Sequence, residues 1–92
     1  MAESIIQKDR ECFFCGRMTG LERHHVFGGT ANRKISEKYG LTVYLCHECH
    51  TGTKGAQYDK TRNLELKKIA QEAFQNIYGR RLWMTLIKKN YL

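Results

Sequence analysis

The fold is decided by two short stretches, Glu11-Cys12-Phe13-Phe14-Cys15-Gly16 and Leu45-Cys46-His47-Glu48-Cys49-His50, each of which carries a Cys-x-x-Cys pair. One such pair supplies two thiolates from a single turn, and two pairs complete the tetrahedral sulfur ligand set of a structural zinc ion. Four thiolates leave no open coordination position, so this zinc is expected to stabilise the fold and not to catalyse. The sequence therefore predicts one structural Zn²⁺ site, with the ligands Cys12, Cys15, Cys46 and Cys49.

The size of the chain and its cellular setting favour metal over disulfides. Its 92 residues are expected to form one domain, 1–92, whose small core needs a metal, a disulfide or a partner. The sequence has neither a secretory apolar segment nor a membrane-spanning run, so a cytoplasmic location without membrane contact is expected. Paired cysteines in a reducing cytosol bind metal more often than they form disulfides. Disulfides, or a zinc site in which His47 or His50 replaces a cysteine, are the less favoured alternatives.

The charge balance points to a polyanionic partner. Sixteen Lys and Arg face nine Asp and Glu, which gives a formal net charge of +7. Such a balance favours nucleic acid as the partner, although a solvated basic surface explains the charge alone equally well.

The pattern of apolar residues predicts an α+β domain. Strands are expected at 21–27 and 41–45, with a turn at Gly28-Gly29-Thr30 and a basic loop over 33–38 between them. This strand, loop and strand would bring His25 close to His50 if the cysteines meet at zinc. A helix begun near His47 should be short because glycines follow at 52 and 55. The zinc core is assigned to about 11–60.

A C-terminal helical segment is assigned to about 63–90. Asn63 is a good N-cap, Gly79 follows Tyr78 where a C-terminal glycine is expected, and helical spacing resumes over 82–87. The expected core stripe of the first helix consists of Leu66, Ile69, Ala70, Ala73, Phe74 and Ile77.

The histidines gather in two clusters, His24-His25 and His47 with His50. The order Cys-x-x-Cys, then Glu-x-His-His with an apolar residue and Gly-Gly, then apolar-Leu-Cys-x-x-Cys-His resembles the HNH endonucleases, and small phage or prophage members in particular. The resemblance covers about residues 11–54 and implies a ββα-metal (HNH) finger. It also implies a metal-dependent endonuclease that hydrolyses DNA phosphodiester bonds and leaves 5′-phosphate and 3′-hydroxyl ends.

The same resemblance implies a role for three of the histidines. His25 would be the general base, while His24 and His50 would bind a catalytic divalent cation such as Mg²⁺, Mn²⁺ or Ni²⁺. An imidazole that titrates near neutrality suits the first role, and a cation with open coordination positions suits phosphoryl chemistry. Neighbouring residues of a strand project to opposite sides, so His24 and His25 would need a local twist, which Gly28-Gly29 would permit.

The sequence departs from the HNH pattern at two places. Leu41 stands where the family has the Asn that braces the loop of the general base, so Asn32 or another polar group would have to replace it. Some members of the family have another metal ligand a few residues beyond the final His, but no histidine follows His50 here. Asp59 is interpreted as a turn or cap residue and not as a ligand.

Basic residues near the expected site are candidates for DNA contacts. Phosphate contacts of this kind position a duplex without reading its sequence, so nicking with low sequence specificity is expected. The assigned candidates are Arg23, Arg33, Lys34 and Lys54. The alternative function is a catalytically inactive, zinc-stabilised module that binds nucleic acid or a phage protein. Phage packaging or recombination proteins are possible partners in the bacterial host, and either a monomer or a homodimer fits the sequence.

Overall fold

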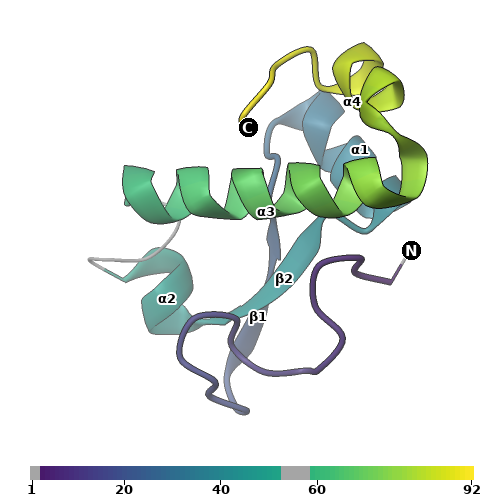
Figure 1. Cartoon of the computed structure of the whole chain (residues 1–92). Coiled ribbons are helices and arrows are strands. Elements are labelled where there is room, and N and C mark those ends of the chain that lie inside the picture. The colour runs from purple at the N-terminus through teal and green to yellow at the C-terminus, as the bar shows by residue number, and fades with distance from the viewer. Residues whose placement is uncertain (1–2, 53–58) are drawn as a thin grey trace.

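The computed structural model describes residues 3–52 and 59–92, and over these ranges the chain is a small α+β protein with a two-stranded sheet (Figure 1). In chain order the elements are β1 (Leu21–His25), α1 (Thr30–Tyr39), β2 (Thr42–Cys46), α2 (His47–Thr51), α3 (Lys60–Tyr78) and α4 (Arg80–Leu86). None of the helices in these ranges is both long and apolar enough to cross a membrane.

The two predicted strands pair with each other. β1 runs antiparallel to β2, in a register that places Leu21 opposite Cys46 and His25 opposite Thr42. In β2 the side chains of Thr42, Val43, Leu45 and Cys46 are buried, so this strand forms the centre of the core. α2 follows β2 directly and, as predicted, is only one turn long.

The expectation of a basic loop over 33–38 is wrong, because these residues belong to α1. Ile35 and Tyr39 lie one turn apart on this helix and pack against the core. The helix ends at Gly40, whose φ of 72° is left-handed. A Cβ at Gly40 would also lie 2.0 Å from the carbonyl oxygen of Glu3, so only glycine fits this close approach.

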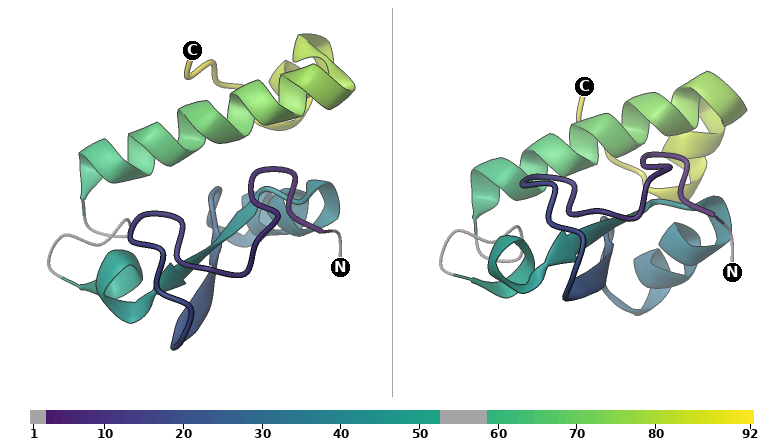
Figure 2. Two further views of the ribbon diagram at one scale, coloured as in Figure 1. Left: turned by 60° about the horizontal axis from the view of Figure 1, so that its bottom comes forward. Right: turned by 90° about the horizontal axis from the view of Figure 1, so that it is seen from below.

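α3 is the long helix that the apolar stripe predicted, but it starts at Lys60 and not at Asn63. The carboxylate of Asp59 accepts hydrogen bonds from the amides of Thr61 (2.9 Å) and Arg62 (3.2 Å), so Asp59 is the N-cap. The helix crosses the two strands, and both turned views keep it on the same side of them (Figures 1 and 2).

Only part of the expected stripe on α3 is core. Leu66, Ala70 and Phe74 are fully buried and recur every four residues, whereas Ile77 is 57% exposed. Ile77 was therefore wrongly included. The helix is near its end there, and its buried face continues into α4 through Trp83, whose ring lies 5.4 Å from that of Phe74.

The C-terminal tail folds back onto α3. Trp83 is fully buried and its indole N–H donates to the carbonyl of Lys89 (2.9 Å). The buried side chain of Gln71 accepts from the amide of Tyr91 (2.7 Å) and donates to Asn90 (2.8 Å). These bonds fix residues 89–91 beside the middle of the long helix.

Candidate metal centre and histidine pair

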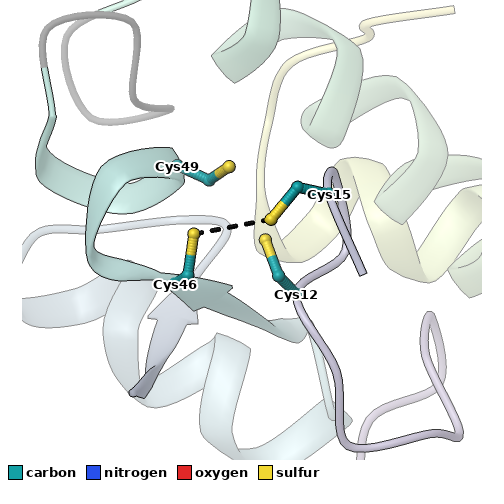
Figure 3. Close-up of side chains that lie close together, drawn as sticks. All are labelled: Cys12, Cys15, Cys46 and Cys49. Carbon is teal, nitrogen blue, oxygen red and sulfur yellow. Dashed lines mark hydrogen bonds between the residues drawn. The ribbon is translucent and has the colours of Figure 1, made fainter. Parts of the chain in front are cut away.

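The four cysteines converge from three parts of the chain (Figure 3). Cys12 and Cys15 lie in the loop before β1, Cys46 ends β2 and Cys49 lies on α2. Their sulfur atoms all lie within 4.8 Å of one another, and the Sγ atoms of Cys15 and Cys46 are 3.6 Å apart. A tetrahedron of ~2.3 Å zinc–sulfur bonds has sulfur atoms about 3.8 Å apart. We call these four cysteines the zinc cluster. Their thiols are not disulfide-bonded, so they can hold a metal ion such as zinc, as predicted.

The backbone of the first knuckle is shaped around the sulfur atoms. The amide of Cys12 donates to the carbonyl of Arg17 (2.7 Å), and that of Gly16 donates to the carbonyl of Cys12 (2.9 Å). Gly16 has a φ of 78°, which agrees with the tight turn expected after Cys15.

The thiols of the zinc cluster have unequal acidities. Burial raises the pKa of Cys12, but hydrogen bonds with the backbone of Cys46, Cys15 and Phe14 outweigh it and lower the pKa to about 6. Burial and hydrogen bonds to the other three thiols raise the pKa of Cys49 to about 12. A bound cation would favour the thiolate form of all four cysteines and offset their mutual repulsion.

His24 and His50 lie against each other and form what we call the imidazole pair. Their ring centroids are 5.0 Å apart, with the first ring carried by β1 and the second by α2. His24 is only 8% exposed, and its Nε2 is buried without a hydrogen-bond partner among the described residues. Burial and the charges of His50, His25 and Lys67 lower its pKa to about 4. At neutral pH its imidazole is uncharged and can offer a nitrogen lone pair to a cation.

Glu22 orients the second ring of the imidazole pair. Its Oε1 lies 2.8 Å from Nδ1 of His50, and its Oε2 lies 3.4 Å from Nδ1 of His47. These hydrogen bonds, led by that to His50, lower the pKa of Glu22. A carboxylate that accepts from Nδ1 leaves Nε2 of His50 available as a ligand, an arrangement common among metal-binding histidines.

Sequence reasoning missed Glu22, although strand alternation could have found it. Residues 22 and 24 lie two apart on β1 and so project to the same face. Among the described residues, the zinc cluster is the only group of three or more Cys, His, Asp or Glu in metal-binding geometry, so no third such residue joins the imidazole pair.

His25 points to a different part of the molecule. Its Nε2 lies 3.0 Å from Oε1 of Glu37 on α1. The hydrogen bond to His25 lowers the pKa of Glu37, and the charges of Arg23 and Arg33 lower it further. The ring contact with His50 is made by His24, whereas the side-chain contact of its neighbour His25 is with Glu37, as expected for strand residues that face opposite ways.

With Leu41 at the place of the expected Asn, the segment after His25 is braced by the backbone of Leu41 and by a side chain of α1. Leu41 is fully buried, and its carbonyl accepts from the amide of Val26 (3.0 Å). The buried hydroxyl of Ser36 accepts from the amide of Phe27 (3.2 Å) and donates to its carbonyl (3.0 Å). The segment after His25 is therefore braced by Ser36, one turn beyond Asn32 on α1.

The candidate DNA contacts are distributed unevenly. Arg23 lies on β1 and Arg33 on α1, and both act electrostatically on Glu37, so they lie near His25. Lys34 is an exposed residue of α1. Lys54 lies outside the described residues.

Comparisons with protein-family models, curated proteins and solved structures found no match to this chain.

Proposed function

We propose that the chain is a metal-dependent endonuclease of the HNH type that hydrolyses DNA phosphodiester bonds. The observation that carries the proposal is the imidazole pair, in which a buried, unpartnered Nε2 of His24 lies beside a second imidazole held by a carboxylate. An unsatisfied buried nitrogen is costly unless something binds it, and a divalent cation would satisfy it.

The order of the elements supports a ββα-metal finger. β1 pairs antiparallel with β2, and α2 follows without a connecting loop. Each of the three elements contributes to the two sites: β1 provides His24, β2 provides Cys46 and α2 provides Cys49 and His50. α1 is an insertion in the connection between the strands.

The residues can divide the work of hydrolysis between them. A cation held by His24 and His50 would neutralise charge on the phosphate oxygens. His25 would accept the proton of the attacking water through Nδ1, since Nε2 faces Glu37, and Glu37 would stabilise the resulting imidazolium. The water oxygen forms a bond to phosphorus while the bond to the 3′ oxygen breaks, which leaves 5′-phosphate and 3′-hydroxyl ends.

The test is nicking of supercoiled plasmid by zinc-loaded protein with Mg²⁺, Mn²⁺ or Ni²⁺. We expect His24→Ala, His25→Ala and His50→Ala each to reduce the rate at least ~100-fold, the lower end for a general base. His47→Ala is the matched control, because His47 shares α2 and Glu22 with His50 but its side chain is 71% exposed. Nicking that survives all three substitutions would contradict the proposal.

A second candidate is a zinc-stabilised module that binds DNA or a phage protein without cleaving it. The contact of His25 with Glu37 favours it, because this contact engages one ring nitrogen of the would-be base with a side chain of α1. DNA binding without nicking under any metal, by wild type and His25→Ala alike, would favour this module over the enzyme.

A further inference from the structure

A second candidate site lies between the start of α3 and the C-terminal tail. A cavity of about 250 Å³ opens there, lined by Asp59, Lys60, Asn63, Leu64, Lys67, Lys89 and Tyr91. The tail that closes it returns to α3 (Figure 1) and is fixed by the hydrogen bond between Tyr91 and Gln71. We call Lys60, Lys67 and Lys89 the lysine cradle.

Two ammonium groups of the lysine cradle approach the same aromatic ring. Those of Lys67 and Lys89 lie 5.5 Å and 5.2 Å from the ring centroid of Tyr91, at distances where cation–π attraction acts. Among the described residues, no carboxylate lies within ion-pair distance of either. The carboxylate of Asp59 accepts the amides of Thr61 and Arg62. A cavity with clustered positive charge of this kind favours an anion.

The chemistry of the lining, with three lysines, suits a phosphate group. Lysine binds phosphate as a point charge and needs no fixed bidentate geometry, which suits a phosphodiester on a flexible backbone.

One residue of the lysine cradle contacts the segment that follows the histidines of β1. The ammonium of Lys67 also lies 5.9 Å from the ring centroid of Phe27, two residues beyond His25. Lys67 thus lies close to the segment that directly follows β1, the strand that carries His24.

We propose that the lysine cradle binds one backbone phosphate of the DNA strand whose scissile phosphodiester lies at the imidazole pair. The identity of the polyanion rests on the proposed function, whereas the phosphate chemistry rests on the cavity. Basic residues on α3 and the tail thus extend the DNA surface beyond the zinc core.

The test is fluorescence anisotropy of a labelled 20-base-pair duplex with the full, zinc-loaded chain, measured without added divalent cation across a salt series. The double substitution Lys67→Gln with Lys89→Gln is compared with Lys68→Gln and Lys88→Gln, the adjacent exposed lysines, which change the net charge equally. The cradle pair should weaken binding about 10-fold and lower the log–log salt slope by about 1, as expected for one lost phosphate contact. The control pair should stay within about 2-fold of wild type.

Three further results complete the test. Lys67→Arg with Lys89→Arg should keep the affinity for DNA, because the charge is retained. Retained affinity would also show that substitution at these two positions does not by itself unfold the protein. Equal losses in the cradle and control pairs would overturn the proposal, as would submillimolar binding of inorganic phosphate in calorimetry, which would assign the cavity to free phosphate. Plasmid nicking is measured separately. If the protein nicks DNA but the cradle pair does not weaken DNA binding 10-fold, only the lysine cradle is refuted. If the cradle pair weakens DNA binding 10-fold but the protein does not nick DNA, only the nuclease proposal is refuted.

Discussion

The two neighbouring histidines of β1 have different environments, and in each case one contacting residue defines the environment. His24 meets His50 in a buried contact, while His25 meets Glu37 on the other side of β1. The sequence was sufficient to predict His24 and His50 as partners through the HNH resemblance. It assigned no role to Glu22, although this residue opens the Glu-x-His-His motif, and it did not reveal Ser36 or Glu37, which belong to no motif and act only through the tertiary fold.

Ser36→Ala should destabilise the zinc-loaded protein by about 1–3 kcal/mol, since it leaves the buried amide and carbonyl of Phe27 without their side-chain partner. Urea unfolding followed by Trp83 fluorescence measures this. Thr85→Ala removes an exposed hydroxyl that bonds within α4 and should cost less than about 0.5 kcal/mol. Equal costs for the two would show that Ser36 does not brace this segment.

Glu22→Gln should weaken the binding of a divalent cation to the imidazole pair by roughly 10–100-fold, because the carboxylate no longer orients His50. Titration calorimetry of the zinc-loaded protein with Ni²⁺ measures the affinity. Glu48→Gln is the control. Glu48 also lies on α2, but none of the described hydrogen bonds joins its side chain to the ring of His24 or His50. An unchanged affinity in Glu22→Gln would remove Glu22 from the site.

At the scale of elements, the sequence predicted the two strands, the short α2 and the long α3, because their apolar periodicity or flanking glycines are clear. α1 was missed because Gly28-Gly29 and the basic residues after them suggested a loop. Its helical signal was weak, consisting of Ile35 and Tyr39 one turn apart and Gly40 as the terminating residue. Glu37 and Ser36, which both lie on α1, were therefore not identified.

Asp59→Ala should destabilise the protein by about 1 kcal/mol, because the first amides of α3 lose their capping carboxylate. Thermal unfolding of the zinc-loaded protein measures it. Glu65→Ala removes an exposed acid from the interior of the same helix and should change stability by less than about 0.5 kcal/mol. If both variants unfold together with wild type, Asp59 is not a stabilising cap.

At the scale of the whole molecule, a two-stranded sheet lies against α3, and the four cysteines gather at the end of β2 (Figure 2). A sheet of two strands is marginal by itself, and the core of a chain this small adds little. The cysteine spacing alone was enough to predict the cluster, because two Cys-x-x-Cys pairs supply the four ligands of one metal ion.

Removal of zinc by a strong chelator should therefore unfold the region around β2 and α2. Structural zinc contributes about 10–16 kcal/mol in small domains, as much as the whole stability of a typical protein. Circular dichroism should show a loss of ordered structure that added Zn²⁺ restores. A chelated protein with an unchanged unfolding midpoint would mean that the zinc cluster is not structural.

The central claim is that His24 and His50 bind a divalent cation in addition to the zinc held by the cysteines. Its most direct test is calorimetric titration of the zinc-loaded protein with Ni²⁺, beside His24→Ala, His50→Ala and the exposed control His47→Ala. We expect one added ion per chain for wild type and His47→Ala, and none for the other two variants. Wild-type protein that binds no ion beyond its zinc, or an added ion that survives the loss of both His24 and His50, would contradict it.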